Sequence, residues 1–439
     1  VDEGVGVELF DQYGNRVPCQ LSDISRYPHG GLKSARVTFI AKEVPPIGYT
    51  TYYYKPVSIA ASLPVAANVE GRFENGFYIM ELDSRGICYL FDRESGIEII
   101  GGEDMRGGEV FTMQSAGNGA GEFIDIQQPG MEGYDYTGSG QESQSWKVIE
   151  EGDVFTTYMI RQKIRNATVE RRIRFYHLVK KIDLDVSLLN WEGVLFREFR
   201  MGLALNMTSA KVAYDVPYGV VEVGKDEMDG SAGERYVTNC SDIHPRGIQN
   251  WIGASDNRIG VTLSSSVAVA DFIDPRDNPL QGPVLQPILL ASRQSCHWEG
   301  NDYLQTGDHH YHFSFTTHRP GWENGYRFGT GSNEKLFAVQ GYRKYSDAKL
   351  PETMSFFSID AENIMVSAVK KAEDSDNIVI RGYDIKGLET RARINMFRGY
   401  SKAVPVNIIE FLLHDNSAVE TGSLPFFGRF SIETFRLDF

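Results

Sequence analysis

The stretch that decides the fold runs from residue 72 to residue 100 and reads RFENGFYIMELDSRGICYLFDRESGIEII. Three short apolar runs, 77–82, 87–91 and 97–100, are separated by two polar turns at 83–86 and 92–96. Aspartate and serine hydrogen-bond their own backbone in such turns, and glycine accepts a positive φ without steric cost. Because turns this short join antiparallel strands, the stretch predicts a three-stranded β-meander.

The first strand of this meander is apolar on both faces. Phe77 and Ile79 would lie on one face, and Tyr78, Met80 and Leu82 on the other, because side chains alternate along a strand. A strand that is buried on both sides is typical of the middle of a layered structure. The meander therefore predicts the entry to a large β-sandwich.

The rest of the chain repeats this pattern. Strands are expected at 154–165, 170–176, 181–190, 260–264, 307–318, 356–359, 364–373, 378–383 and 430–437, with shorter ones before residue 55. In the first of these, Arg161, Lys163 and Arg165 form a basic face, which acidic residues of neighbouring strands are expected to pair. After Trp322 the sequence predicts an irregular region. No amphipathic helix longer than two turns is evident, so the fold class is expected to be all-β.

Composition narrows the classes of partner. The 439 residues carry a net charge of −15, which disfavours nucleic acid and anionic membranes as partners. No apolar run approaches the roughly 20 residues of a membrane helix. The four cysteines are widely spaced and form no CxxC motif, so free thiols are expected. We expect neither a nucleic acid nor a membrane as a partner.

Several segments carry a family resemblance. The meander resembles the motif that begins the large β-domain of family 38 glycoside hydrolases, the metal-dependent α-mannosidases, and the matching positions are Asn75, Tyr78, Asp83, Gly86, Ile87, Leu90, Asp92, Ser95 and Gly96. Segments 44–52, 307–322, 363–383 and 430–437 resemble further family motifs in the family's order. His309, His318 and Trp322 match one of these motifs. Looser matches are the segment 216–222, which ends in Glu222, and the segment 244–251, which ends in Trp251.

The resemblance implies the domain organisation. It predicts a large antiparallel super-sandwich, similar to the galactose-mutarotase-like fold, flanked by smaller β-sandwich units. The expected boundaries are a small β unit at 1–55, a linker at 56–70, the large super-sandwich at 71–330 and a C-terminal β-sandwich unit at 351–439.

The resemblance also implies a function for the intact parent protein, the hydrolysis of α-mannosides by a retaining glycosidase. Family members carry their zinc ligands and nucleophile in an N-terminal catalytic domain, and none of the nine histidines here is followed two residues later by aspartate. We therefore expect this chain to lack catalytic residues and cofactors, to be inactive alone, and to support and edge that catalytic domain, which would hold zinc. Two alternatives stay open, a stand-alone carbohydrate-binding module and an independent sugar enzyme of the mutarotase or lyase type.

Candidate site residues fall in two places. The glycine-rich segment 101–145 and its end offer carbohydrate-contact candidates, because carboxylates bind hydroxyl groups and rings pack on sugar C–H groups; these are Glu122, Asp125, Tyr134 and Trp146. His310 and His312 would share a strand face and are weak metal candidates. Zinc needs three or four converging ligands, so cross-strand partners are the expected role of both histidines and no metal is expected.

Overall fold

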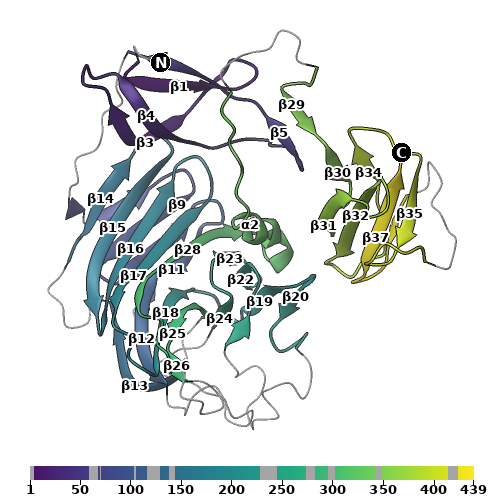
Figure 1. Ribbon diagram of the computed structural model, residues 1–439. Helices are drawn as coiled ribbons and strands as arrows, with labels where there is room; N and C mark the ends of the chain where they lie inside the picture. The colour runs from purple at the N-terminus through teal and green to yellow at the C-terminus, as the bar shows by residue number, and fades with distance from the viewer. Residues whose placement is uncertain are drawn as a thin grey trace.

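The computed structural model describes residues 4–58, 68–69, 71–102, 105–115, 129–137, 144–227, 245–272, 282–294, 302–341, 349–413 and 424–439. Two extended sheets and a smaller one build its central unit (Figure 1). The ten-stranded sheet has the order β20 (Gly219–Glu222), β19 (Lys211–Val216), β22 (Trp251–Ser255), β23 (Gly260–Ser265), β28 (Gly307–His318), β17 (Ile182–Trp191), β16 (Ala167–Tyr176), β15 (Phe155–Ile164), β14 (Trp146–Glu151) and β7 (Asn68–Val69). The six-stranded sheet has the order β13 (Pro129–Tyr136), β12 (Glu109–Ser115), β18 (Arg197–Ala204), β25 (Val284–Ala291), β24 (Val269–Asp271) and β21 (Arg246–Gly247).

The meander at 72–100 forms the third sheet, in the order β11 (Ile97–Ile100), β10 (Gly86–Asp92), β9 (Tyr78–Asp83) and β8 (Gly71–Glu74). Its turns use the chemistry that the sequence predicts. Asp83 Oδ1 accepts the backbone N–H groups of Arg85 (2.8 Å) and Gly86 (3.1 Å), and Gly86 has a φ of 151°. Asp92 Oδ1 closes the second turn through residues 94 and 95, both at 2.9 Å. The predicted meander is confirmed.

The main hydrophobic core lies between these sheets. The long strands β15, β16, β17 and β28 run antiparallel side by side (Figure 1). Alternate residues of each point into the core. The core combines apolar side chains of all three sheets, among them Tyr78, Met80, Leu90, Ile173, Phe175, Leu184, Phe199, Met201, Leu203, Leu263, Leu285, Phe313 and Phe315. The predicted large antiparallel super-sandwich is therefore the architecture of the central part of the chain.

Smaller sheets flank this unit on both sides in sequence. The N-terminal segment forms a sheet of β2 (Arg16–Val17), β1 (Gly6–Phe10) and β6 (Tyr53–Val57), and a hairpin of β3 (Cys19–Arg26) and β4 (Leu32–Phe39). The C-terminal segment has a sheet in the order β31 (Ile364–Lys371), β32 (Ile378–Asp384), β37 (Ile432–Asp438) and β35 (Lys402–Val406), with the pairs β30 (Phe357–Ile359) with β34 (Ile394–Met396) and β33 (Thr390–Arg391) with β36 (Phe426–Phe427). These C-terminal strands enclose a second core.

Two further strand pairs complete the fold. One joins distant segments of the chain, and the other closes a local loop. β5 (Gly48–Thr50) pairs antiparallel with β29 (Thr353–Ser355), which joins the N-terminal segment to the start of the C-terminal one. β26 (Arg293–Gln294) pairs with β27 (Asp302–Tyr303). The expected boundaries at 55, 70, 330 and 351 stay predictions.

Helix is rare in the described residues. The 3₁₀ helix η1 (Trp322–Asn324) and the α-helix α2 (Tyr326–Gly331) replace the irregular region that the sequence predicts after Trp322. Neither of these helices has the length and apolar character needed to cross a membrane. The all-β prediction is confirmed, and the short helices are the exception to it.

Candidate functional site

A groove of about 440 Å³ lies on the outer face of the ten-stranded sheet, where β20, β19, β22, β23 and the end of β28 lie side by side. In Figure 1 these strands lie below α2, on the side of the central unit that faces β31 and β32. We call this site the outer groove. Its lining consists of Ser209, Lys211, Ala213, Glu222, Lys225, Trp251, Gly253, Ala254, Ser255, Asp256, Asn257, Val261, Thr262, His318, Gly321, Trp322 and Glu323.

Strand alternation and small residues open the outer groove. Val212, Ile252 and Leu263 point into the main core, so their neighbours in the chain point outward. Ala213 lies opposite Gly253 in the strand register, and neither has a bulky side chain. A Cβ atom on Gly253 would lie 2.7 Å from the carbonyl oxygen of Val261, so a larger residue there would collide with the next strand. The small side chains of Ala213 and Gly253 therefore leave space above the sheet.

His318 closes one end of the outer groove. Its Nε2 lies 2.9 Å from Thr262 Oγ1, and its Nδ1 lies 2.7 Å from the carbonyl oxygen of Arg319. The ring lies over Gly260, where a Cβ would come within 2.2 Å of it. Burial lowers the pKa of His318 below its usual value, so the ring is neutral at neutral pH. A neutral imidazole held on both nitrogens acts here as a fixed wall.

Two indole rings and a set of charged groups complete the lining. Trp251 is fully buried in the floor, and among the described residues its indole N–H has no hydrogen-bond partner. Trp322 is partly buried and meets Tyr326 edge to face. At the rim, Lys211 Nζ lies 3.1 Å from Glu222 Oε1. The groove thus presents aromatic surface beside paired hydrogen-bonding groups.

Four of these groove residues belong to motifs that the sequence analysis singled out, namely Glu222, Trp251, His318 and Trp322. The sequence did not indicate that they meet, because they lie on segments up to 100 residues apart that only the sheet order brings together. Alternation along β19 and β22 places Lys211, Ala213, Trp251 and Gly253 on outward faces, but the sequence predicts no strand at 211–216 or 251–255 from which this could be read.

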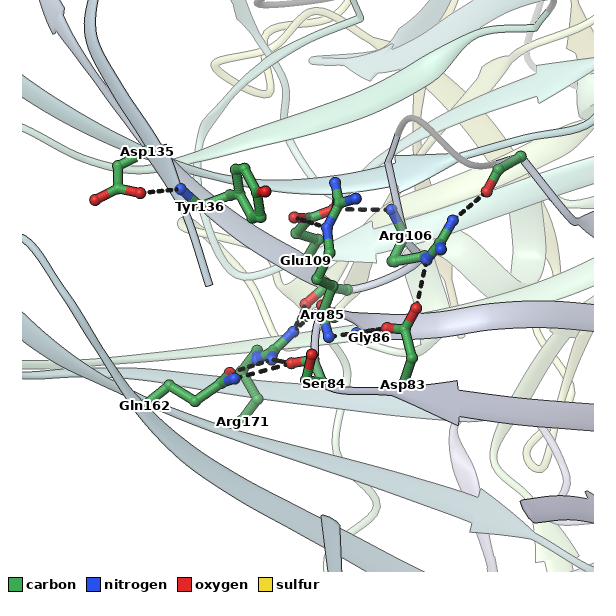
Figure 2. A network of polar contacts seen from close by, with 12 residues as sticks. Asp83, Ser84, Arg85, Gly86, Arg106, Glu109, Asp135, Tyr136, Gln162 and Arg171 are labelled. Atoms are coloured by element: carbon green, nitrogen blue, oxygen red, sulfur yellow. Dashed lines mark hydrogen bonds and ion pairs between the residues drawn. The ribbon is translucent and has the colours of Figure 1, made fainter. Parts of the chain in front are cut away.

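A second polar cluster anchors the glycine-rich segment to the sheets (Figure 2). Arg85 forms two hydrogen bonds with the fully buried Glu109, at 2.8 and 3.0 Å. Arg106 Nε donates to Asp83 Oδ2 at 2.7 Å. Burial raises the pKa of Glu109, whereas the Arg85 guanidinium opposes that rise. We call this set, together with Arg171, the turn network.

Arg171 lies at the centre of the turn network. It is buried, and it donates to the carbonyl oxygens of Ser84, Arg85 and Gly108 and to Gln162 Oε1 (Figure 2). Burial lowers its pKa to about 10. Because its partners are backbone carbonyls of the meander turn, the arginine fixes this turn against the ten-stranded sheet rather than presenting charge to a ligand.

The structure places the carbohydrate-contact candidates as follows. Glu122 and Asp125 lie outside the described residues, and so does the side chain of Tyr134. Trp146 is 2% exposed, its Nε1 donates to the carbonyl oxygen of Asp83 at 2.7 Å, and the Arg171 guanidinium lies 5.3 Å from its ring centre. Trp146 is thus held between the meander turn and Arg171. For all four residues the sugar contact stays a prediction.

The histidine pair has ordinary cross-strand partners. His310 Nδ1 lies 2.9 Å from Ser187 Oγ, and His312 Nδ1 lies 2.6 Å from Asp185 Oδ1, both on the neighbouring strand β17. Within the ranges that the structure describes, no three His, Cys, Asp or Glu side chains are grouped to hold a metal. The described residues therefore do not fit a zinc site.

Two family models match the sequence. The model of the glycosyl hydrolases family 38 C-terminal domain matches residues 73–268, and that of the family 38 C-terminal beta sandwich domain matches residues 363–433. The first match covers the meander and most of the outer groove, and the second covers β31, β32 and β35 of the C-terminal sheet and ends at the start of β37. No curated protein matches the sequence.

Solved structures share the fold over almost the whole chain. An alpha-mannosidase from Enterococcus faecalis V583 matches with a TM-score of 0.73 and 14% identity, covering 98% of this chain and 51% of that one. A family 38 glycosyl hydrolase protein from Enterococcus faecalis matches with a TM-score of 0.74 and 14% identity, covering 98% of this chain and 52% of that one. A putative aldose 1-epimerase from Escherichia coli K12 matches with a TM-score of 0.36 and 9% identity, over 58% of this chain and 100% of that one. This chain spans about half the length of the first two structures.

Proposed function

Because this chain belongs to the C-terminal region of glycosyl hydrolase family 38, we propose that it is the non-catalytic half of an α-mannosidase-type glycoside hydrolase. In this proposal the chain supports a catalytic domain, forms one edge of its substrate cleft, and contributes to α-mannoside hydrolysis only when the two parts are together. Its partners are then that N-terminal catalytic domain and the carbohydrate substrate.

One observation carries this proposal. The fold match takes in 98% of this chain but only 51% and 52% of the two similar structures. Each of those proteins therefore has a second half of comparable size that this chain does not contain. Both family models also describe C-terminal domains of family 38. We therefore propose that this C-terminal region acts together with an N-terminal half.

Metal chemistry is assigned to the other half. The best-placed histidines, His310 and His312, are each paired with one residue of β17, and they do not converge with a third ligand. A retaining glycosidase also needs two carboxyl groups about 5 Å apart in an open cleft. The turn network does not offer this, because Glu109 is fully buried and paired with Arg85. We therefore derive no catalytic step for this chain.

The test compares the chain alone with the chain joined to the segment that the proposal places before residue 1. Hydrolysis of an aryl α-mannoside is measured for each, with added zinc and with a chelator. We expect no turnover by the chain alone in either condition, and zinc-dependent turnover by the joined protein. The catalytic segment alone serves as the control, and it should be less active or less stable than the joined form.

Turnover by the chain alone, abolished by the chelator, would overturn the proposal, because it would require a metal site within these 439 residues. A catalytic segment that is fully active and stable without this chain would overturn the supporting role. Sugar binding by this chain alone is a separate function, and the outer groove is the observation that favours it.

A further inference from the structure

We propose that the outer groove is a binding site for one residue of a neutral sugar. The proposal concerns binding by this chain itself and does not depend on the proposed catalytic partner. It rests on the size of the groove, on its ring surfaces, on its paired polar groups and on its balance of charge.

The size and depth of the groove suit a small ligand. Its volume of about 440 Å³ lies within the usual range for small-molecule pockets, about 300–1,000 Å³. Ala213, Trp251 and Gly253 form the floor of the groove, and His318 closes one end of it. Since the floor is built from paired strands, it is already formed without a ligand.

The ring surface comes from Trp322. This residue lies on η1, immediately after the strand that carries His318, and its side chain is only partly buried. Tyr326 meets it edge to face with 6.3 Å between ring centres, which fixes the orientation of the indole. Sugars have one face of C–H groups, and these groups pack on an indole ring. A fixed, partly open indole at the wall of a groove is the surface that such a face needs.

The groups that would bind the sugar hydroxyls lie on β19 and β20, at the edge of the ten-stranded sheet. Lys211 and Glu222 place a donor and an acceptor 3.1 Å apart on the same side of the groove. Two hydroxyl groups on neighbouring ring carbons need this arrangement, because one of them can accept from the ammonium while the other donates to the carboxylate. The Glu222 side chain is 13% exposed and the Lys211 side chain 70% exposed, so the acceptor is fixed and the donor can adjust.

The charges of the lining do not favour an anionic ligand. Glu222, Asp256 and Glu323 are acidic, and Lys211 and Lys225 are basic. Asp256 is paired with Arg258 at 2.9 Å, and Glu222 with Lys211 at 3.1 Å. Burial keeps His318 neutral at neutral pH, so it adds no positive charge. The lysines of the lining are offset by its carboxylates, so a phosphate or uronate group gains no net attraction here, and a neutral sugar needs none.

The test measures binding of methyl hexopyranosides of the manno, gluco and galacto series to this chain, by calorimetry or ligand-observed NMR. Methyl glucuronoside serves as the anionic counterpart of the glucoside. We expect at least one neutral sugar to bind, and the glucuronoside to bind at least about tenfold more weakly than the glucoside.

Two variants locate the site. Trp322→Ala removes the ring surface, and Glu222→Gln removes the acceptor charge while keeping the shape of the side chain. Each should weaken binding at least about tenfold. Because Trp322 also contacts Tyr326, its loss could disturb folding, so Glu222→Gln on the sheet edge is the decisive variant. Tyr13→Ala, an exposed ring in the N-terminal sheet region, should bind like the wild type.

Three outcomes would overturn the proposal. They are no binding of any neutral sugar to the wild type, binding that a folded Glu222→Gln protein retains in full, and equal binding of the glucuronoside and the glucoside. A negative result here leaves the catalytic-partner test unaffected, because that test measures turnover of the joined protein and not binding by the groove.

Discussion

Single residues with unusual environments give the sharpest tests. Asp215 on β19 is 2% exposed, and its Oδ2 accepts one hydrogen bond from Asn250 at 2.8 Å. Burial raises its pKa from 3.8 to about 6. Between about pH 4 and pH 6 the native protein then holds a proton that the unfolded chain has lost. The free energy of unfolding must therefore fall as the pH rises through this window.

The first prediction follows from this carboxyl group. Asp215→Asn removes the titration, so the pH dependence between pH 4 and 6 should flatten by up to about 3 kcal/mol. Urea unfolding at pH 4, 5, 6 and 7 measures it. Asp302→Asn, an exposed aspartate, should leave the wild-type slope in place. An unchanged slope in Asp215→Asn would show that the carboxyl group is not the source of the effect.

For single residues, the sequence predicts ion pairs between adjacent strands better than it predicts the residues of the outer groove. The basic face at 161–165 was expected to pair with acids, and Arg161 Nη2 does lie 2.7 Å from Glu170 Oε2 on β16. Arg161 and Glu170 are register partners in the hairpin of β15 and β16, and the turn between these strands determines that pairing. The outer groove could not be predicted in the same way, because Glu222, Trp251 and His318 become neighbours only through the order β20-β19-β22-β23-β28. Alternation gives the face of each residue but not the strand that lies beside it.

Among the elements, the meander turn shows how a short loop is held by buried charge. The turn network joins residues 83–86 to β12 through Glu109 and to β16 through Arg171 (Figure 2). A buried ion pair contributes little net stability when intact, but removing one partner leaves the other charge without compensation. The network therefore makes the register of the meander against the sheets costly to change.

The second prediction tests this network. Arg85→Met leaves the fully buried Glu109 without its guanidinium partner and should lower the free energy of unfolding by about 3–5 kcal/mol. Arg72→Met is the matched control, since Arg72 lies 3.9 Å from Glu81 in an exposed pair of the same sheet. Its cost should stay within about 1 kcal/mol. Equal losses in urea unfolding would contradict the assigned role of Glu109.

The third prediction concerns α2, the helix that the sequence did not indicate. Residues 325–331 contain three glycines, which disfavour helix, so tertiary contact has to supply the stability. A Cβ on Gly329 would lie 2.4 Å from Cγ of Trp251, whereas a Cβ on Gly331 meets nothing within 4 Å. Gly329→Ala should therefore cost about 1–3 kcal/mol.

Gly331→Ala, in the same helix, is the control for that substitution. It should be neutral or stabilising by up to about 1 kcal/mol, because alanine favours helix and nothing obstructs it. Thermal unfolding of the two variants separates the effects. Destabilisation by both would mean that close packing on the tryptophan is not the cause, because helix propensity alone favours alanine at both positions.

For the whole molecule, the central unit and the C-terminal sheet meet through aromatic residues. The hydroxyl groups of Tyr326 and Tyr383 lie 3.1 Å apart, and the Tyr218 ring meets the Tyr383 ring edge to face at 5.2 Å. Trp251, Ala213 and Ile385 are buried in the same cluster. We expect this interface to make the unfolding of the two parts cooperative.

The fourth prediction tests that cooperativity. All five tryptophans lie between residues 146 and 322, so their fluorescence reports the central part, whereas circular dichroism reports every strand. The two melting curves should coincide in the wild type. In Tyr383→Ala the dichroism curve should begin to fall at a lower temperature than the fluorescence curve, and the exposed-ring variant Tyr303→Ala should show no separation. Coincident curves in Tyr383→Ala would show that other contacts carry the coupling.

The sequence predicts the all-β class of the fold, but it does not predict the strand pairings between distant segments. Alternation and turn residues give strands, and antiparallel hairpins give their nearest partners. The pairing of β5 with β29 leaves no such trace, because Tyr49 and Met354 become partners across the whole central unit. A three-residue strand carries too little pattern to specify a partner at that distance.

That pairing has a consequence for how the chain is made. Thr50 and Thr353 are register partners separated by 303 residues. At about 5–20 residues per second, a ribosome needs roughly 15–60 s to synthesise the intervening chain. Throughout that time the nascent β5 edge has no partner strand and is open to pairing with other chains. Translation speed between these two threonines should therefore set how much of the newly made protein is lost to aggregation.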